Sequence, residues 1–305
     1  MITTDTPLVS VVVMTYNSAK FIIETLESVK AQTWKNIELI VTDDGSTDHT
    51  VQLCLDWIEA NRSHFSATKF ITVAQNTGIP SNNNRGLRAA TGEWIKTFSG
   101  DDNLMENCIA DNLEYARRFP EASFITSDLR EIDENSVLIR DNVINDGLIF
   151  FANLPSAKKQ LKNYSRWPVF LNTPAFFCKR EIWKISGYCD EELKIYDDTT
   201  AVFRILSKGV KLYYMNKPTV EYRIYPNSIS RSEKVNDIRE KEAYRIFKKY
   251  RNQNLSIFNP LDLSIYYESW LVFKYKGFMG RKGISYLRKL SLYYWYMQFN
   301  GVKSY

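Results

Sequence analysis

A turn, a short apolar strand and two adjacent carboxylates follow one another in the stretch Gly92-Glu93-Trp94-Ile95-Lys96-Thr97-Phe98-Ser99-Gly100-Asp101-Asp102-Asn103. In an open sheet of parallel strands, ligands bind outside the carboxyl ends of the strands. Two aspartates there suit a hard cation, because Mg²⁺ and Mn²⁺ take oxygen ligands and bridge carboxylates to a substrate's phosphates. An isolated Asp-Asp pair is more often a solvated turn with one aspartate capping the next helix. The rest of the chain favours the ligand site.

The first 120 residues alternate between apolar strands and amphipathic helices. The predicted strands are 9–14, 37–41, 70–74 and one ending at 99, and the predicted helices are 19–31, 51–58, 81–90 and 105–119. Ser18 and Asp48 are predicted to cap the first two helices. This alternation predicts an open parallel sheet flanked by helices, with the polar residues after the first, second and fourth strands meeting at one edge.

Beyond residue 120 the pattern is weaker. Strands are predicted at 122–126, 173–178, 211–215 and 220–224, and helices at 179–185, 199–208, 234–250, 262–278 and 284–299. Glycines follow two of these helices, at Gly187 and Gly209, as is typical of helix C-termini. Residues 129–165 are mixed and polar, and we interpret them as an insertion on the acceptor side of the site.

Charge is distributed unevenly along the chain. Residues 231–305 hold 15 Lys and Arg against 6 Asp and Glu, a net charge of +9, whereas residues 1–230 carry a net charge of −4. The last quarter is also dense in aromatic residues. It is therefore predicted to be a distinct basic, aromatic, helical segment.

Several classes of protein are disfavoured by the sequence. No apolar run approaches the ~18 residues that a membrane-spanning helix needs. The N-terminal residues lack the basic start of a secretory signal, so a cytoplasmic protein is expected. The four cysteines show no close pairing, which predicts buried free thiols and not a zinc site or disulfide framework. No Gly-x-Gly-x-x-Gly follows any strand, so a dinucleotide dehydrogenase is disfavoured.

Five stretches together resemble a family 2 glycosyltransferase of the GT-A fold, of the type that builds bacterial cell-surface polysaccharide. They are 9–17, 38–48, 76–86, 92–102 and 187–230, in this order. The resemblance implies an α/β fold with a mainly parallel central sheet flanked by helices. It further implies a catalytic domain over 1–230, with a nucleotide-sugar half to about residue 128 and an acceptor half from about 129, followed by a helical extension over 231–305.

The resemblance also implies roles for individual residues in binding the donor. Tyr16 would stack on the nucleotide base, and Asp44 would accept a hydrogen bond from a base N–H. Asn84 and Arg85 would lie near the diphosphate sugar, and Arg223 would belong, with Tyr222 and 228–230, to a loop that closes over the diphosphate. The remaining members of the predicted nucleotide-sugar set are Thr15, Asn17, Asp43, Asn76 and Asp101.

Two acidic pairs would carry the chemistry. Asp101 and Asp102 match the family's metal- and ribose-binding motif, which implies Mn²⁺ or Mg²⁺ as cofactor. Asp197 and Asp198 occupy the place of the pair that supplies the general base, with Asp198 preferred. The structural alternative for the second pair is a cap on the following helix.

The chain departs from the family pattern at three positions. Ser99 stands where many members have Asp, Tyr225 where many have His, and Met14 where many have Pro. Metal binding would therefore rest on Asp102, the donor's phosphates and water. His49 and His64 are interpreted as surface residues.

The expected reaction is transfer of a sugar from a nucleotide diphosphate sugar, with UDP-sugar as the default donor, to an acceptor hydroxyl. A carboxylate in reach of that hydroxyl can remove its proton, and a single attack from the opposite face inverts the anomeric centre. Two alternatives remain open. One is a phosphotransferase or phosphatase with Asp43 as nucleophile. The other is a non-catalytic nucleotide-sugar-binding protein, which is compatible with the loss of one carboxylate from the acidic motif at Ser99.

The basic aromatic segment has two interpretations. Its helices could simply pack on the catalytic domain, or they could contact anionic lipid at the inner face of the cytoplasmic membrane. In the second case the acceptor would be a saccharide on a polyprenyl diphosphate. Nucleic-acid binding has a similar charge signature, but no recognised module accompanies it, and no nucleic-acid partner is expected.

Overall fold

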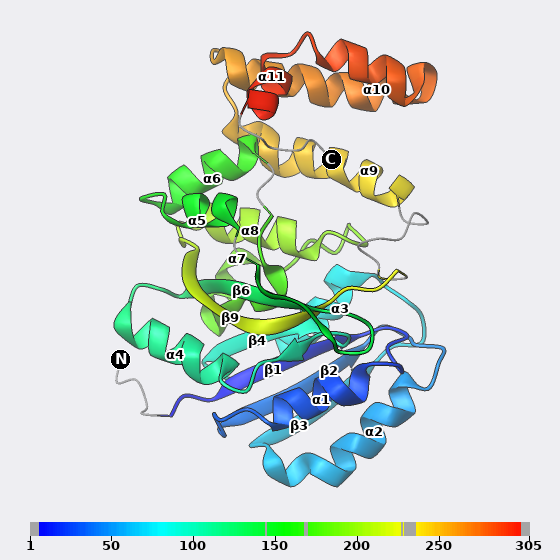
Figure 1. The fold of residues 1–305 in the computed structure, drawn as a ribbon, viewed down its shortest axis with the longest axis vertical. Helices are drawn as coiled ribbons and strands as arrows, with labels where there is room; N and C mark the ends of the chain where they lie inside the picture. The colour runs from blue at the N-terminus through cyan, green and yellow to red at the C-terminus, as the bar shows by residue number, and fades with distance from the viewer. Residues whose placement is uncertain (1–5, 144, 168–169, 227, 229–235, 300–305) are drawn as a thin grey trace. The chain divides into compact units, whose positions relative to one another are not determined.

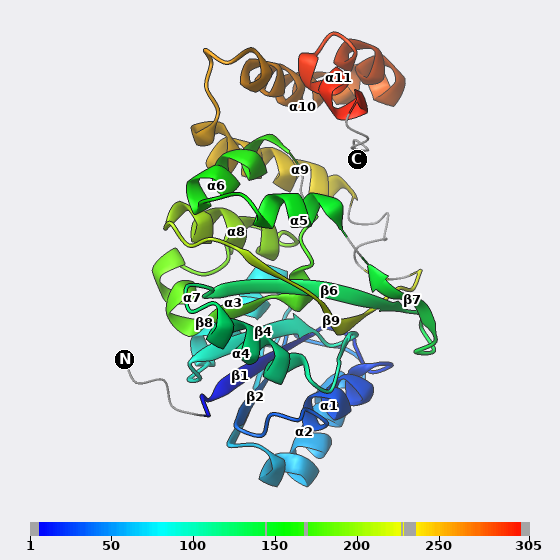
Figure 2. The same cartoon turned by 60° about the vertical axis from the view of Figure 1, so that its left-hand side comes forward.

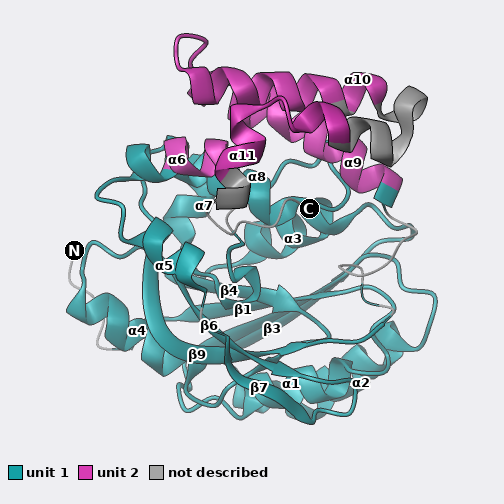
Figure 3. Cartoon of the chain, turned by 45° about the horizontal axis from the view of Figure 1, so that its top comes forward, with its two compact units in different colours: residues 1–160, 169–236 teal, residues 161–168, 237–305 magenta. Residues whose placement is uncertain are grey.

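The computed structural model describes residues 6–143, 145–167, 170–226, 228 and 236–299. The chain forms two compact units, one of residues 1–160 with 169–236 and the other of residues 161–168 with 237–305 (Figure 3). The predicted domain boundary after residue 230 lies outside the described residues, as do positions 229 and 230 of the predicted closing loop. The domain division stays a prediction.

A mixed sheet of nine strands, counted over the described residues, forms the centre of the first unit. Its path is β3-β2-β1-β4-β8-β6-β9-β5, and β7 pairs with β6. The strands are β1 (Val9–Thr15), β2 (Ile37–Asp43), β3 (Ala67–Thr72), β4 (Trp94–Ser99), β5 (Asn103–Leu104), β6 (Phe124–Ile132), β7 (Leu138–Val143), β8 (Phe177–Lys179) and β9 (Tyr213–Arg223).

The first four strands are parallel neighbours, as the alternation of strands and helices predicted. In the registers, Thr15 of β1 lies opposite Asp43 of β2, and Met14 lies opposite Ser99 of β4. The carboxyl ends of these three strands therefore meet, which confirms that their polar residues share one edge. The other half of the sheet is less regular, because β8 is antiparallel to β4 and β6 whereas β6 and β9 are parallel.

Helices cover both faces of the sheet. Figures 1 and 2 show α1 and α2 on one face of the parallel strands and α3 on the other. The helices of the first unit, including one that runs into the second, are α1 (Ile22–Lys30), α2 (Thr50–Asn61), α3 (Ile79–Ala89), α4 (Cys108–Arg118), α5 (Asp146–Ala152), α6 (Ala157–Arg166), α7 (Arg180–Ser186) and α8 (Asp197–Ser207). Buried Val11, Val13, Leu39 and Phe98 belong to the main core, where each apolar side chain leaves water.

Several local predictions were wrong. Ser18 does not cap α1, because the helix begins at Ile22 and the amides of Phe21 and Ile22 donate to the backbone carbonyl of Ser18, whereas its hydroxyl accepts from the amide of Tyr16. The strand predicted at 173–178 is a 3-10 turn over Thr173–Ala175 followed by β8. The strands predicted at 211–215 and 220–224 are one strand, β9, because the pairing with β6 continues through two register shifts.

The second unit contains the aromatic helices. They are α9 (Asn236–Ile246), a π-helical turn (Phe247–Arg251), α10 (Pro260–Arg288) and α11 (Leu292–Phe299). The break predicted near residue 280 was wrong, because α10 is continuous across its glycines, each of which costs a helix only ~1 kcal/mol. None of the helices in the described ranges combines the length and apolar character needed to cross a bilayer.

Segment 161–168 is tied to the second unit by polar and aromatic contacts. The guanidinium of Arg166 makes a two-point ion pair with buried Asp262, at 2.6 and 2.9 Å. The Trp167 ring stacks on Tyr293 and Tyr296, with centroids 5.4 and 4.2 Å away. These contacts explain why a segment so early in the chain belongs to the C-terminal unit.

Helix α3 lies unusually close to β1. A Cβ atom added at Gly86 would stand 2.3 Å from Cγ1 of Val12 and 3.2 Å from Cγ2 of Thr42. Both neighbours are on the buried strands β1 and β2. Only glycine therefore allows the helix to reach the position from which its polar side chains meet the strand ends.

We expect Gly86→Ala to lower the free energy of unfolding by about 3 kcal/mol or more, because α3 or the central strands would have to shift. Chemical denaturation monitored by circular dichroism measures the change. Gly147→Ala is the matched control, since a Cβ there meets only the Asn145 side chain, at 3.3 Å, and should change stability by less than about 1 kcal/mol. Equal stability of Gly86→Ala and wild type would contradict the packing argument.

Candidate active site

The ends of β1 and β2 are joined by hydrogen bonds. The Thr15 hydroxyl donates to Oδ1 of Asp43 at 3.0 Å, and the amide of Asp44 donates to the carbonyl of Thr15. Asn17, at a φ of +50°, accepts from the amide of Thr47 at 2.8 Å. These bonds fix the two loops together and leave the neighbouring Tyr16 side chain 41% exposed, so its ring is free to stack on a flat ligand.

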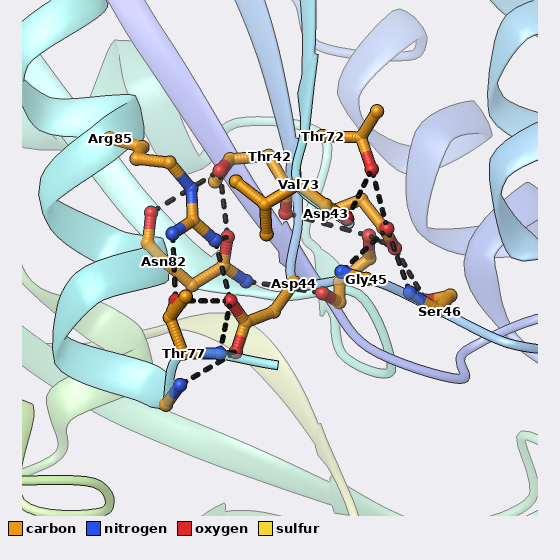
Figure 4. Close-up of polar contacts among 12 residues, drawn as sticks. Thr42, Asp43, Asp44, Gly45, Ser46, Thr72, Val73, Thr77, Asn82 and Arg85 are labelled. Carbon is orange, nitrogen blue, oxygen red and sulfur yellow. Dashed lines mark hydrogen bonds and ion pairs between the residues drawn. The ribbon is translucent and has the colours of Figure 1, made fainter. Parts of the chain in front are cut away.

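Asp43 supports its own loop. Its carboxylate is fully buried and accepts from Gly45 N at 3.0 Å, Ser46 N at 2.9 Å and the Thr72 hydroxyl at 3.0 Å, in addition to the hydroxyls of Thr15 and Ser46 (Figure 4). These internal bonds give the Asp43 carboxylate a structural task in its loop and argue against Asp43 as a phosphotransferase nucleophile. A contact of Asp43 with the nucleotide sugar stays a prediction.

Asp44 points to the opposite side from Asp43, toward α3 (Figure 4). It accepts from the amides of Thr77 and Gly78 and pairs with Nη2 of Arg85 at 2.6 Å. Burial opposes its ionisation, but the hydrogen bonds from Thr77, Arg85 and Gly78 prevail and lower the pKa of Asp44. The structure thus joins Asp44, the predicted partner of the nucleotide base, to Arg85, whose predicted position near the diphosphate sugar stays a prediction. Asn76, just before this turn, is exposed.

Three consecutive asparagines of α3 form hydrogen bonds with different parts of the first unit. Asn82 accepts from the Thr42 hydroxyl at 2.7 Å and donates to the Thr15 carbonyl at 3.1 Å. Asn83 accepts from the Thr97 hydroxyl at 3.1 Å and donates to Oδ2 of Asp197 at 2.8 Å. The helix therefore connects the β1–β2 side of the site with β4 and with the first turn of α8.

Asn84 forms hydrogen bonds inside the protein. It is fully buried, and its amide group exchanges two hydrogen bonds with the backbone of Cys189, at 3.0 and 2.9 Å. Its nitrogen also donates to Glu191 at 2.7 Å. These bonds hold Asn84 to the segment before α8, and its predicted position near the diphosphate sugar stays a prediction. The residue that the sequence reasoning missed is its neighbour Asn83, for which the only signal was its place in a run of asparagines.

The carboxylates after β4 lie against β9. Oδ1 of Asp102 accepts from the amide of Arg223 at 2.9 Å, and Oδ2 of Asp101 accepts from the Tyr225 hydroxyl at 2.8 Å. Burial raises the pKa of both carboxyls, and the Asp101 charge adds to the shift of Asp102. Burial and Asp101 also raise the pKa of the Tyr225 phenol, which keeps it a hydrogen-bond donor at neutral pH.

Arg223 is buried and forms hydrogen bonds with several parts of the first unit. Its side chain has no exposed surface. Its guanidinium donates to the Asp101 carbonyl, to Glu24 of α1 and to the Asp133 carbonyl, at 2.8, 2.8 and 3.1 Å. It also donates to the Ser136 hydroxyl at 2.8 Å. These bonds hold β9, α1 and the β6–β7 turn around the acidic pair. The predicted contact of Arg223 with the nucleotide sugar stays a prediction.

Asp197 and Asp198 form the first turn of α8. The residue at the N-cap is Tyr196, and Oδ1 of Asp198 accepts from the backbone amide of Thr199, so the alternative that the pair stabilises the N-terminus of this helix stays open. Burial and the Asp198 charge raise the pKa of Asp197 to about 7. Burial also raises the pKa of Asp198, against hydrogen bonds from Thr199 and Thr173. Both residues are only partly covered, so a bound molecule can approach them.

The acidic pair after β4 fits a divalent cation that completes its shell from elsewhere. No group of three or more His, Cys, Asp or Glu side chains suited to a metal occurs among the described residues. Asp102 offers Oδ2, for which no partner is found in the described part of the chain, and carboxylate oxygens suit Mg²⁺ and Mn²⁺. All four cysteines are buried and free, as predicted.

Comparisons with known proteins agree with this architecture. The chain is 28% identical over 232 residues, 73% of this chain and 80% of the relative, to the UDP-Glc:alpha-D-GlcNAc-diphosphoundecaprenol beta-1,3-glucosyltransferase WfaP of Escherichia coli. Residues 1–349 of TarS from S. aureus, solved with UDP-GlcNAc, match with a TM-score of 0.61 and 18% identity over 90% of this chain and 76% of that one. The mannosyltransferase PcManGT from Pyrobaculum calidifontis, solved with GDP-Man and Mn²⁺, also matches with a TM-score of 0.61 and 18% identity, over 98% of this chain and 84% of that one.

These structural matches confirm the predicted GT-A fold. The model of glycosyl transferase family 2 matches residues 10–184, more than half of the 305 residues. The match begins in β1 and ends in α7, so it contains the three strand ends that meet in the structure. The chain therefore belongs to glycosyl transferase family 2 and is a glycosyltransferase.

Proposed function

We propose that this enzyme transfers a sugar from a nucleotide diphosphate sugar, by default a UDP-sugar, to an acceptor hydroxyl with inversion at the anomeric carbon. The observation that carries the proposal is the link between the two acidic pairs: Asn83 bonds both Thr97 of β4 and Asp197. The strand β4, which Asp101 and Asp102 follow, is thereby connected to the carboxylates that would act as general base. The product would belong to bacterial surface polysaccharide or lipopolysaccharide.

Each part of the site has a role in this reaction. The exposed ring of Tyr16 stacks on the nucleotide base, and the ion pair of Asp44 with Arg85 lies at the edge of that base. Asp102, with Asp101, would hold Mn²⁺ or Mg²⁺, and such a cation would offset the negative charge of the leaving diphosphate. Asp198 accepts the proton of the acceptor hydroxyl, and the neighbouring Asp197 is electrostatically coupled to Asp198. The names of WfaP and of the TarS complex support a UDP-sugar, whereas the PcManGT complex keeps GDP-sugars as the second candidate.

The second unit supports a further part of the proposal, a contact with anionic membrane that would bring a polyprenyl-diphosphate-linked acceptor. We define the basic aromatic surface by nine exposed residues of α10, α11 and their connection, namely Trp270, Phe273, Lys274, Tyr286, Lys289, Leu290, Leu292, Trp295 and Tyr296. The acidic residues between 252 and 299, Asp262 and Glu268, are buried in ion pairs with arginines. A surface of aromatic and cationic side chains without an exposed carboxylate suits anionic headgroups.

The two acidic pairs should respond differently to substitution. Asp102→Asn should weaken metal-dependent nucleotide binding by about tenfold or more, because it removes a charged ligand. Asp198→Asn should bind nucleotide normally but transfer sugar roughly 10²–10⁴-fold more slowly, because the base is lost. Calorimetry with UDP, GDP and CDP, with and without Mn²⁺, and a donor-turnover assay measure the two effects. Asp56→Asn on α2 is the control, and wild-type turnover by both site variants would rule out the proposed roles.

The rate should depend on pH through the Asp197–Asp198 pair. Below the apparent pKa of the pair, the general base is protonated and the enzyme is slow. Because burial raises the pKa of Asp197 to about 7, the rate should rise as the pH increases through about 7. Asn83→Ala removes a hydrogen bond that lowers the pKa of Asp197, and the rise should move to higher pH. Ser81→Ala, on the same helix, should leave the profile unchanged. A shift to lower pH in Asn83→Ala would contradict this assignment.

The basic aromatic surface should bind anionic vesicles. Reversing two of its charges, in Lys274→Glu with Lys289→Glu, should weaken flotation with vesicles of phosphatidylglycerol by about tenfold or more, because each lysine contributes ~1 kcal/mol near such a surface. The matched control is Lys184→Glu with Lys208→Glu, two exposed lysines of the first unit that change net charge equally. Equal loss in both double variants would show a net-charge effect and refute the surface assignment.

A further inference from the structure

The turn before α10 carries two apolar side chains at its tip. The amide of Asn259 donates to the carbonyl of Ser256 at 3.1 Å, so Ile257 and Phe258 are the two central residues of a β-turn. Such positions usually hold Gly, Pro, Asn, Asp or Ser. Here Ile257 is 63% exposed and Phe258 is 91% exposed, the largest fraction for a large apolar side chain in the described part of the chain. In water, side chains exposed to this extent bring the fold no hydrophobic stabilisation.

Polar groups fix this turn on both sides of its tip. The Asp262 carboxylate, which pairs with Arg166, also accepts from the amide of Ser256 at 3.1 Å. The Asn259 side chain caps α10, because its oxygen accepts from the amides of Leu261 and Asp262 at 3.0 and 3.1 Å. The conformation of the turn is therefore set by these bonds and does not depend on the two side chains at its tip.

The apolar residues on either side of the turn are packed, unlike those at its tip. Leu255 and Leu261 contact the small core of the second unit, which contains Phe247, Ile265 and Tyr293. Ile257 and Phe258 lie between these two leucines in the sequence and are exposed. A tip that is held in this way can enter an apolar phase without a change of conformation, and preorganisation of this kind favours binding.

Two leucines extend the apolar surface at this end of α10. The amide of Tyr293 donates to the Ser264 hydroxyl at 3.0 Å, which joins the start of α11 to the beginning of α10. Leu263 and Leu292, the residues just before this bonded pair, are both exposed. A single scattered apolar residue on a surface would need no explanation, but an apolar turn with further leucines beside the same helix end suggests an interaction site.

The segment around the tip is strongly basic. Residues 247–299 hold nine Lys and Arg but two Asp and Glu, and both acidic residues form ion pairs with arginines of this unit. Lys248 and Lys249 are exposed in the π-helical turn that precedes the tip. The side chain of Asn254 donates to the carbonyl of Tyr250 at 2.8 Å, which connects that π-helical turn to the segment leading to the tip. Cations therefore accompany the apolar tip, a combination that suits the surface of an anionic membrane.

We infer that this turn inserts into an anionic bilayer, with Ile257 and Phe258 at the boundary between headgroups and acyl chains and the neighbouring lysines among the headgroups. A protein partner could also cover an apolar tip, but the excess of cations around it favours anionic lipid. The inference rests on the proposed function for the membrane contact itself. It adds an apolar insertion at residues outside the basic aromatic surface.

Flotation with vesicles of phosphatidylglycerol tests the insertion. Phe258→Ser should weaken binding by about tenfold or more, because the transfer of a phenyl ring out of water is lost. The factor should be similar at low and high salt, since salt screens the lysines but not an apolar contact. The matched control is Phe150→Ser on α5, an exposed phenylalanine of the first unit, which should bind like wild type. The melting temperature of Phe258→Ser should be unchanged, and wild-type flotation by this variant would overturn the inference.

A fluorescent label measures the depth of the tip. The four native cysteines are buried, so bimane can be attached selectively to the exposed thiol of Ile257→Cys. On addition of phosphatidylglycerol vesicles its emission should shift to shorter wavelength, and lipids that carry a nitroxide near the headgroup should quench it. Labelled Phe150→Cys should show neither change. Emission from the tip that stays at the wavelength found in water would overturn the insertion.

The outcomes separate this inference from the proposed function. If Lys274→Glu with Lys289→Glu floats like wild type while Phe258→Ser does not, the basic aromatic surface fails and the insertion stands. The reverse pattern overturns the insertion and keeps that surface. Self-association in sedimentation that Phe258→Ser abolishes, without vesicle binding by the wild type, would assign the tip to a second copy of the chain and overturn the inference. None of these readouts depends on sugar transfer.

Discussion

The three asparagines of α3 are the connection on which the site depends. Consecutive residues of a helix point about 100° apart, so one helical turn can send Asn82, Asn83 and Asn84 to different elements. These residues bond the ends of β1 and β2, the strand β4 with α8, and the segment before α8. Their reach requires α3 to lie directly on β1, which the absence of a side chain at Gly86 allows. The hydrogen bonds of the three asparagines therefore depend on the close packing of α3 against β1.

A second constraint is electrostatic. Burial raises the pKa of Asp101, Asp102, Asp197 and Asp198, so the fold favours the protonated form of each of them more than the unfolded chain does. For a group of this kind, the stability that is present at low pH is lost as the pH rises above the unfolded value. For Asp197 that window runs from 3.8 to about 7. The site is therefore least favourable to the fold where its carboxylates are ionised, and a bound cation would offset that repulsion.

Much of the fold could be predicted because it follows from local patterns of apolar and polar residues. The apolar run of β1, its parallel neighbours and the shared edge of the strand ends followed from alternation alone, and the positions of the two acidic pairs followed from motifs. The roles of Asp43, Asn84 and Arg223 could not be predicted, because each depends on partners that only the folded chain brings close. Arg223 illustrates this, since its partner Glu24 is 199 residues away in the sequence. A motif position identifies where a side chain begins, whereas its burial decides whether it meets a ligand or another part of the protein.

The pairing of Arg166 with Asp262 has a consequence for synthesis on the ribosome. The two residues are 96 positions apart, so at ~5–20 residues per second about 5–20 s pass between the appearance of the arginine and that of its partner. The strands of the first unit are complete soon after residue 223, before most of the second unit exists. During that interval the residues that contact Arg166 and the Trp167 ring in the folded protein have not yet been synthesised. Completion of the second unit is thus a late step in the biogenesis of this enzyme, and one that brings together segments from the middle and the final quarter of the chain.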